Sequence, residues 1–384
     1  MTERLYYLDS HCLRFTAVVT GCEPSGDGWA VTLDRTAFFP EGGGQPADTG
    51  RIGEAMVRDV QERDGEIWHT TDRPVAVGTA VEGVLDAEQR LRRMQNHSGE
   101  HIVSGLAHRL FAVDNVGFHM GADGMTVDFN RELTAEELQQ LERAANETVR
   151  ANVPIRCWFP AEDELHTLDY RSKKELSGAV RLVEIEGVDL CACCAPHVSH
   201  TGEVGLIKLL DAQRHRGGVR ITLICGMDAY DAVCRMQQSV TAVSQALSVP
   251  REKIAEGVAR QLGENARQKE RIAALSLELV RLRAAASESV EGNHVVFDDT
   301  LDEVALRELV NLLMDKCGGL AAAFSGSDAS GYRYIIGSKH VDLRAKSKAI
   351  NAAISGRGGG KPEMIQGSCT ADAATIRAAL DGLL

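Results

Sequence analysis

Residues 86–111 read DAEQRLRRMQNHSGEHIVSGLAHRLF, and this stretch decides how the middle of the chain folds. It contains no proline, and its apolar residues recur at helical spacing: Leu91, Met94, Ile102, Leu106 and Leu110. That period predicts an amphipathic helix. His97 and His101 stand four residues apart within it, so their imidazoles share one face of the helix.

A second motif supplies further donors of the kind that bind zinc. Residues 191–197 read CACCAPH and place Cys193 four residues before His197. Two imidazoles from the helix, one thiolate and a third imidazole satisfy tetrahedral zinc. The sequence therefore predicts a Zn²⁺ site whose ligands are His97, His101, Cys193 and His197.

Alternatives remain at this site. Cys191 or Cys194 is an alternative sulfur ligand, and the metal site is either catalytic or purely structural. A zinc peptidase of the HExxH type is disfavoured, because Ser98 follows the first histidine where the general base glutamate would stand.

The regions on either side of the predicted helix differ in character. Residues 1–85 are rich in β-branched and aromatic residues, and an Asp64-Gly65 turn joins two predicted strands, so we expect a small β-barrel. Residues 86–228 combine helices and strands in an α+β domain, including a helix near 134–151 opened by a capping box.

The C-terminal third is predicted to hold a helical arm and an α/β domain. Residues 229–289 form the arm, which carries apolar residues at heptad spacing: Ile272, Leu275, Leu279, Leu282 and Ala286. These residues pack on their own protein or form a coiled-coil hairpin or dimer seam. Residues 290–384 alternate strands and helices, which indicates an α/β sandwich. The predicted fold class is thus an α+β multidomain protein.

Composition limits the classes of function. The 384 residues include 42 Lys and Arg against 55 Asp and Glu, and the net charge of -13 disfavours a protein covered with basic residues for non-specific nucleic-acid binding. A local basic cluster remains, because seven basic residues and one acid lie between Gly331 and Lys361. With no secretory signal or transmembrane stretch visible, we expect a cytoplasmic protein with mostly reduced thiols.

Two glycine-rich segments are candidate binding sites. Gly42, Gly43 and Gly44 let the backbone approach a ligand closely, and Gln45 offers a donor and an acceptor, although a plain tight turn explains the same residues. The segment 355–362, SGRGGGKP, is predicted as a basic loop suited to a phosphate backbone or simply exposed to solvent. It lacks the first glycine and the Ser or Thr of an ATP-binding P-loop.

Together these motifs resemble a known family. The run TAFFPEGGGQ at 36–45 looks like the glycine-rich motif of the editing domain of alanyl-tRNA synthetase. The HxxxH at 97–101 and the CxxxH at 193–197 look like that domain's two zinc motifs, although CCAPH replaces the family's Cys-Gly-Gly-Thr-His. The C-terminal third resembles the domain found beside DHH phosphoesterases, so the chain is similar to the long form of the free-standing AlaX editing proteins.

The resemblance implies trans-editing, the hydrolysis of the ester in tRNA(Ala) charged with serine or glycine. It implies that Thr36 hydrogen-bonds the serine hydroxyl, and that Gly42, Gly43, Gly44 and Gln45 hold the terminal adenosine and ester. Arg357 and Lys361 of the C-terminal domain are expected to bind tRNA phosphates, and the chain is expected to form a homodimer through the arm or that domain. The competing functions are a zinc-stabilised RNA-binding protein without hydrolysis and a zinc hydrolase of small amino esters.

Overall fold

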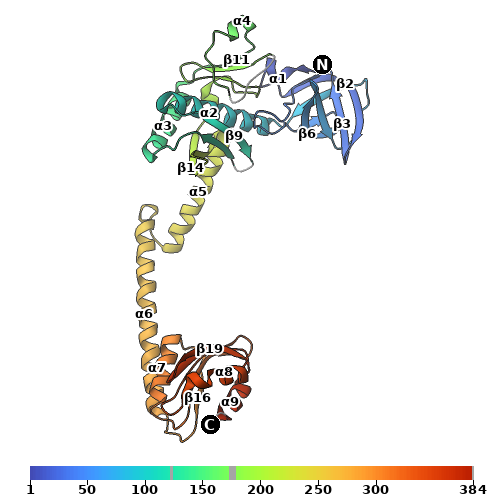
Figure 1. The fold of residues 1–384 in the computed structure, drawn as a ribbon. Helices are drawn as coiled ribbons and strands as arrows, with labels where there is room; N and C mark the ends of the chain where they lie inside the picture. Colours follow the sequence, from blue (N-terminus) through green and yellow to red (C-terminus); the bar gives the residue numbers. More distant parts are fainter. Residues whose placement is uncertain (122–123, 173–178, 383–384) are drawn as a thin grey trace. The chain divides into compact units, whose positions relative to one another are not determined.

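The computed structural model describes residues 1–121, 124–172 and 179–382. The chain divides into two compact units, Met1–Thr241 and Ala242–Leu384, and each is described by itself. The broad prediction of a mixed α and β multidomain fold is confirmed (Figure 1). The finer domain boundaries given above stay predictions. None of the helices in the described ranges is long and apolar enough to cross a membrane.

The first unit begins with a closed six-stranded barrel in the order β2-β3-β7-β6-β5-β8. Its strands are β2 (Arg14–Ser25), β3 (Gly28–Leu33), β5 (Gly50–Ile52), β6 (Ala55–Arg63), β7 (Glu66–Thr71) and β8 (Ala80–Leu85). A short parallel pair, β1 (Glu3–Arg4) with β4 (Arg35–Thr36), and helix α1 (Leu5–Leu8) precede or interrupt it. Alternate strand residues such as Val31, Ile52 and Val60 fill the barrel core, as the period-2 pattern of half-buried strands requires.

The rest of the first unit packs helix α2 (Ala87–Phe111) into an α+β core shared with two antiparallel sheets. The four-stranded sheet has the order β14-β15-β10-β9, and the three-stranded sheet has the order β11-β12-β13. The elements are β9 (Asn115–Gly121), β10 (Gly124–Phe129), α3 (Ala135–Ala151), β11 (Ile155–Trp158), α4 (Glu162–Leu165), β12 (Leu182–Ile185), β13 (Asp189–Ala192), η1 (Thr201–Val204), β14 (Ile207–His215) and β15 (Gly218–Cys225). The capping box predicted at Thr134 and Glu137 is present at the start of α3.

The predicted helical arm consists of α5 (Gly226–Leu247), the short η2 (Arg251–Lys253) and α6 (Ile254–Ala286). The boundary between the two units falls inside α5. Within the second unit, Val280 and Ala284 of α6 are buried against α7 (Glu303–Leu313). The heptad residues lie elsewhere on α6, and all five are exposed.

The C-terminal domain is a five-stranded sheet of order β16-β17-β18-β20-β19. Helices α6 and α7 cover one face, and α8 and α9 pack on the core of the other. The elements are β16 (His294–Phe297), β17 (Ala321–Ser327), β18 (Gly331–Gly337), α8 (Leu343–Ala353), β19 (Gly356–Lys361), β20 (Met364–Cys369) and α9 (Ala373–Asp381).

One element differs from the sequence prediction. The segment GRGGGK was predicted as a loop, but it is the edge strand β19, paired antiparallel with β20. Its glycines serve close packing: a β-carbon at Gly358 would lie 2.3 Å from the hydroxyl oxygen of Tyr334. Tertiary contact therefore overrides the low strand propensity of glycine here.

Candidate metal centre

Helix α2 places two histidines on its buried face. Its first turn is capped by the Asp86 side chain, which accepts a hydrogen bond from the backbone N–H of Gln89. His97 and His101 are only 2% and 3% exposed, and their rings stack with centroids 5.6 Å apart. The i, i+4 spacing read from the sequence therefore brings both imidazoles into one buried cluster.

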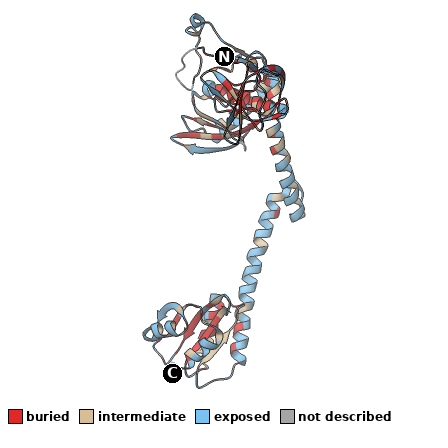
Figure 2. Cartoon of the chain, turned by 90° about the vertical axis from the view of Figure 1, so that its right-hand side faces the viewer, coloured by how far each residue is buried: buried red, intermediate tan, exposed pale blue. Residues whose placement is uncertain are grey.

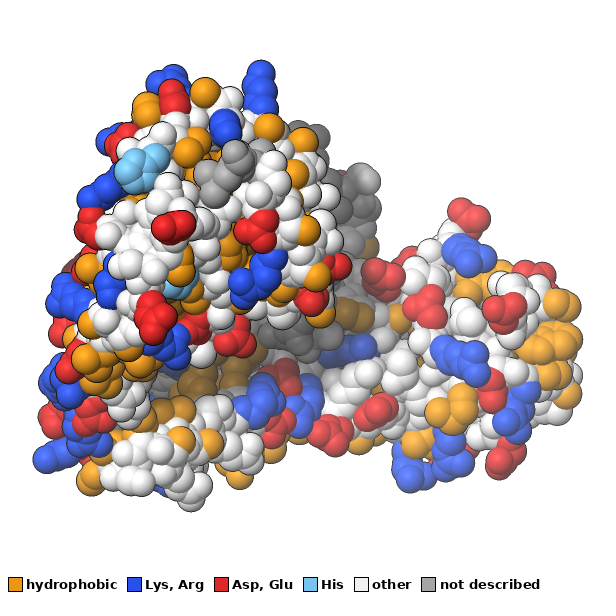
Figure 3. Space-filling model, turned by 90° about the horizontal axis from the view of Figure 1, so that it is seen from below, with side chains coloured by type: hydrophobic (Ala, Val, Ile, Leu, Met, Phe, Trp, Pro, Cys, Tyr) orange, Lys and Arg blue, Asp and Glu red, His pale blue; other side chains and the backbone are white. Residues whose placement is uncertain are grey.

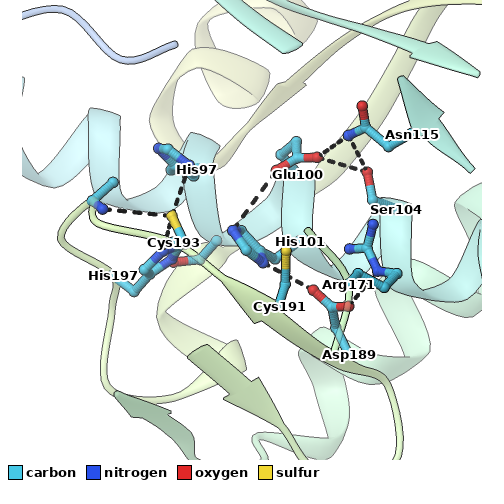
Figure 4. A network of polar contacts seen from close by, with 12 residues as sticks. His97, Glu100, His101, Ser104, Asn115, Arg171, Asp189, Cys191, Cys193 and His197 are labelled. Carbon is cyan, nitrogen blue, oxygen red and sulfur yellow. Dashed lines mark hydrogen bonds and ion pairs between the residues drawn. The ribbon is translucent and has the colours of Figure 1, made fainter. Parts of the chain in front are cut away.

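The loop after β13 brings the second pair of predicted ligands to the same point. The Sγ atom of Cys193 lies 3.5 Å from Nε2 of His97 and 3.4 Å from Nε2 of His197. The His197 ring stands edge-on to His97 and His101, with centroids 5.0 and 4.8 Å away. One donor atom from each of the four residues falls within 4.8 Å of the others (Figure 4).

This geometry fits a zinc ion. With Zn–S near 2.3 Å and Zn–N near 2.0–2.1 Å, a tetrahedral site separates its sulfur and nitrogen ligands by about 3.6 Å. The two sulfur–nitrogen distances in the structure, 3.5 and 3.4 Å, are close to that value. Cys193 is the sulfur that joins the three histidines, whereas Cys191 groups with Asp189 behind His101.

Each histidine is oriented through its Nδ1 atom by a different partner. The Nδ1 atom of His97 lies 2.9 Å from Oε1 of Gln45, that of His101 lies 2.9 Å from Oδ2 of Asp189, and that of His197 lies 3.0 Å from Oγ of Ser98. Hydrogen bonds at Nδ1 leave Nε2 of each ring for the metal, because the partner fixes the tautomer and the ring orientation.

Asp189 is the most strongly held of these partners. It is buried beside His101, and the Nε atom of Arg171 donates to its other oxygen at 2.8 Å. Burial alone would raise the pKa of Asp189, but the hydrogen bonds and charges of His101 and Arg171 outweigh it and lower that pKa. The carboxylate is therefore ionised and fixed behind the ligand.

Burial also sets the protonation of two ligands. It lowers the pKa of His197 well below the ordinary value, an effect that His101 and His97 strengthen. The neutral imidazole that binds a metal is thus favoured at His197. Burial raises the pKa of the Cys193 thiol, so binding of a metal there requires release of the proton.

The glycine-rich loop of the barrel contacts this centre. Gly42 and Gln45 exchange backbone hydrogen bonds of 3.1 and 3.0 Å, which closes a tight turn. Gly43 and Gly44 have positive φ, and a β-carbon at Gly44 would lie 2.6 Å from Cδ1 of Phe118. The tight turn is therefore present, its glycines approach Phe118, and Gln45 contacts His97; the expected approach to a ligand stays a prediction.

A buried ion pair fixes the barrel against α2. The guanidinium of Arg90 contacts Asp48 and donates to the backbone oxygen of Ser10 at 2.8 Å. The same carboxylate accepts from the N–H of Phe39 at 2.7 Å. Because Asp48 follows the glycine loop closely in sequence, this pair sets the position of the loop relative to the metal centre.

A cavity of about 570 Å³ opens beside the cluster. Its walls carry the glycine loop, three of the metal-centre residues, aromatic rings and one arginine: Gly43, Gly44, His97, His101, Cys193, Tyr7, Phe118, Phe159 and Arg181. Such a lining, mostly apolar with a few polar groups, is usual for small-molecule sites. The cavity is therefore a candidate binding site for a small molecule beside the centre.

The structure does not bring every predicted site residue here. Thr36 is fully buried in the barrel, where its hydroxyl accepts from the N–H of Phe38 and lies 2.9 Å from Nε2 of His69. Thr36 is not among the described residues that line the cavity, and its expected contact with a serine hydroxyl stays a prediction. Arg357 and Lys361 lie on β19, in the second unit.

Other residues of the centre could not be identified from the sequence. Asp189, Arg171 and Ser98 act through partners far away in the chain, and no local spacing points to them. Glu100 stands between the two histidines in the sequence. It accepts from Oγ of Ser104 at 2.6 Å, and its other oxygen lies 3.9 Å from Nε2 of His101 (Figure 4).

Three segments of the chain match known protein families. Residues 180–222 match the threonyl and alanyl tRNA synthetase second additional domain, and residues 283–383 match the DHHA1 domain. Residues 14–89, which include the barrel strands, match the class II (A) tRNA synthetases. Three separate parts of the chain are thus each similar to a part of these families.

The individual proteins that resemble this chain are alanine–tRNA ligases. The alanine–tRNA ligase of Halobacterium salinarum is 36% identical over 88% of this chain and 38% of the ligase. Those of Halorubrum lacusprofundi and Methanopyrus kandleri are each 33% identical, over 99% and 95% of this chain and 43% and 42% of the ligases. The chain therefore spans about two fifths of the length of these relatives. The resemblance predicted from the motifs is confirmed: the chain is an AlaX-like relative of alanyl-tRNA synthetase.

Proposed function

We propose that the chain is a trans-editing hydrolase that cleaves the aminoacyl ester of tRNA(Ala) charged with serine or glycine. The observation that carries this proposal is the contact between Gln45 of the glycine loop and His97, a residue of the metal centre that lines the cavity. The likeness to alanine–tRNA ligases supports tRNA(Ala) as the substrate carrier.

The charging of tRNA(Ala) with serine has to be corrected at a second site. A pocket built for alanine cannot strongly reject a side chain that only adds a hydroxyl, so discrimination has to come from a site that binds the hydroxyl. Such a site rejects alanine because its own polar groups would remain unpaired.

Gln45 is buried and, like Thr36, is not among the described residues that line the cavity, but it contacts His97, which does line it. Its Oε1 is held by His97, while its Nε2 is buried and has no hydrogen-bond partner among the described residues. A buried donor left unpaired costs about 1–3 kcal/mol, so a ligand acceptor would relieve it. We assign this N–H to the ester or the terminal ribose; the neighbouring Gly43 and Gly44 line the cavity.

His97, His101, Cys193 and His197 would hold the zinc ion. When bound, the ion would supply Lewis acidity to a substrate group that added to its coordination or displaced one of these four ligands. The Nδ1 partners of the three histidines keep the ligands in place, and the cavity beside them would receive the substrate.

The C-terminal domain supplies a second contact to tRNA in this proposal. Strand register places Ser325, Arg333, Ser368 and Arg357 in one row across β17, β18, β20 and β19. All four line a cavity of about 910 Å³, which Asp302 and Glu303 border at the start of α7. Two guanidinium groups that flank a hydroxyl suit the oxygens of a phosphate backbone.

The basic residues between Gly331 and Lys361 therefore lie on two different surfaces of the C-terminal domain. Arg333, Arg357 and, by strand alternation, Lys361 share the face of this row, whereas Arg344 and Lys348 belong to α8, which packs on the opposite face. On the face drawn in Figure 3, basic and acidic side chains intermingle without a large area of one sign. We expect tRNA contact to be local rather than a property of the whole surface.

One experiment separates the candidate functions. Purified protein is mixed with Ser-tRNA(Ala), Ala-tRNA(Ala) and a free seryl ester, each with and without a chelator. Hydrolysis of only the mischarged tRNA supports editing; binding without hydrolysis supports the RNA-binding protein; hydrolysis of the free ester supports the small-molecule enzyme. His97→Ala should abolish activity, and His108→Ala, an exposed histidine on the same helix, serves as the control.

A further inference from the structure

The buried interior of the first unit, drawn in red in Figure 2, includes an arginine at the cavity beside the metal centre. Arg181 is only 6% exposed, and it stands directly before β12. Among the described residues that line the cavity it is the one lysine or arginine, and none of them is an aspartate or a glutamate. Apart from the metal centre itself, the described wall of the cavity therefore carries a positive charge.

The contacts of Arg181 hold its side chain in place without neutralising it. Its Nη1 atom donates to the backbone oxygens of Cys193 and Ala195, at 3.0 and 2.8 Å. The thiol of Cys157 is a further hydrogen-bonding neighbour of the guanidinium. Among the described residues, no Asp or Glu forms an ion pair with it. Because burial of a cation without a counterion is costly, an anion that enters the cavity is expected to bind there.

Two aromatic rings continue the same wall of the cavity. The Cζ atom of Arg181 lies 5.1 Å from the ring centroid of Tyr7, and that ring meets Phe159 edge-on with centroids 5.3 Å apart. Phe159 is 47% exposed and lines the cavity, so its ring is open to a ligand. Every nucleobase has a π-face that stacks on aromatic side chains, so this ring suits a base.

We infer that this wall binds the terminal nucleotide of the aminoacyl-tRNA, with the 5′-phosphate of that nucleotide at Arg181 and its base on Phe159. The inference rests on the proposed function, because it places the 3′ end of that substrate. A nucleotide joins an anion to a base through one ribose, and Tyr7 alone lies between Arg181 and Phe159 in this row of contacts. Arg181 also contacts the backbone oxygen of Cys193, whose Sγ atom belongs to the metal centre. An ester on the ribose would therefore lie beside the centre.

A purely structural role for Arg181 predicts a different result. Its bonds to Cys193 and Ala195 brace the loop that carries two metal ligands, so its removal is expected to affect zinc binding as well. A structural residue would change the affinity for every ligand of the cavity. A phosphate-binding residue changes the affinity only for ligands that carry a phosphate, so the informative quantity is a ratio of two affinities.

The test compares two non-hydrolysable ligands, 3′-deoxy-3′-serylamino-adenosine and its 5′-monophosphate, by calorimetric titration of the full zinc-loaded chain. The parent should bind the monophosphate about 10- to 100-fold more tightly, the range expected for hydrogen bonds to a charged group. This preference should vanish in Arg181→Gln. Arg156→Gln changes an exposed arginine of β11 outside the described lining, and it should keep the preference of the parent. Equal binding of the two ligands by the parent, or a full preference in Arg181→Gln, overturns the inference.

Arg181→Lys provides the ratio where the glutamine variant does not retain its zinc. Lysine keeps the charge but lacks the planar fork of the guanidinium, so the preference for the monophosphate should fall below that of the parent. An unchanged preference in Arg181→Lys counts against a phosphate at this residue.

The base-stacking part of the inference has its own pair of variants. Phe159→Ala should weaken the binding of both ligands by about tenfold and leave their ratio unchanged. Phe159→Tyr keeps an aromatic ring and should bind both ligands as the parent does. Unchanged affinities in Phe159→Ala contradict stacking on this ring.

These titrations do not depend on catalysis. If Ser-tRNA(Ala) is not hydrolysed, the proposed function fails, while the ratio of affinities still decides whether this wall binds a nucleotide. If Ser-tRNA(Ala) is hydrolysed but the parent binds the two ligands equally, the editing proposal stands and the placement of the terminal nucleotide is wrong.

Discussion

The Nδ1 atom of His97 lies 2.9 Å from Oε1 of Gln45, and this hydrogen bond joins the barrel to the metal centre. The two residues are separated by 52 positions in the sequence. The contact orients a ligand and at the same time points the free amide N–H of Gln45 away from it. One side chain thus connects metal binding with the proposed handling of substrate.

Gln45→Ala should weaken both functions. Loss of a hydrogen bond behind a metal ligand typically lowers metal affinity about 10- to 100-fold. We expect that loss in a zinc competition assay, together with a larger loss of deacylation, because the amide donor disappears as well. Gln140→Ala, an exposed residue of α3, should change neither. Unchanged zinc affinity in Gln45→Ala would show that Gln45 does not support zinc binding.

Asp189→Asn tests the support of a second ligand. An amide can accept the hydrogen bond of His101, but it lacks the charge that Arg171 and His101 share. Zinc affinity should again fall by about 10- to 100-fold, while the fold measured by circular dichroism persists. Glu184→Gln, a nearby carboxylate on β12 that is not in the centre, should bind zinc as the parent does. Equal affinities for Asp189→Asn and the parent would remove Asp189 from this role.

His69 predicts a pH dependence of stability. Burial lowers its pKa to about 4 in the folded barrel. An unfolded histidine has a pKa of about 6.5, so between these values the unfolded chain binds more protons and stability falls as the pH is lowered. The loss reaches about 3 kcal/mol at the acid end of the window.

Urea unfolding of the parent and of His69→Gln from pH 7 to pH 4.5 measures this effect. Since glutamine does not titrate, the variant should lose less stability over the window than the parent. Parallel curves for the two proteins would show that His69 does not contribute.

We expect the two arginines of the row on the C-terminal sheet, Arg333 and Arg357, to contribute to the salt dependence of tRNA binding. Arg333→Ala with Arg357→Ala should weaken binding and lower the slope of log affinity against log salt by up to about 2, one for each phosphate that an arginine no longer neutralises. Arg344→Ala with Lys348→Ala removes the same charge from α8, on the other face, and should leave the slope nearly unchanged. Equal slopes for the two double variants would argue against a contact specific to this row.

The sequence was most informative where local spacing determines geometry. His97 and His101 lie one helical turn apart, and Cys193 and His197 lie in one short loop, so the four ligands were predictable as two pairs. The heptad residues of α6 and the capping box of α3 were readable for the same reason.

Other features depend on contacts between distant parts of the chain. Asp189 reaches His101 and Arg90 reaches Asp48 only after the sheets and the barrel have packed on α2. The contacts of the Thr36 hydroxyl with His69 and with the N–H of Phe38 likewise depend on how the barrel packs. The glycines of β19 look like a loop until Tyr334 packs against them.

The most direct test of the central claim is the rate at which purified protein deacylates Ser-tRNA(Ala) relative to Ala-tRNA(Ala). The account predicts rapid hydrolysis of Ser-tRNA(Ala), slow hydrolysis of Ala-tRNA(Ala), about one zinc per chain, and loss of both zinc and activity in His97→Ala. Metal-free protein that retains full activity, or equal hydrolysis of the two charged tRNAs, would contradict it.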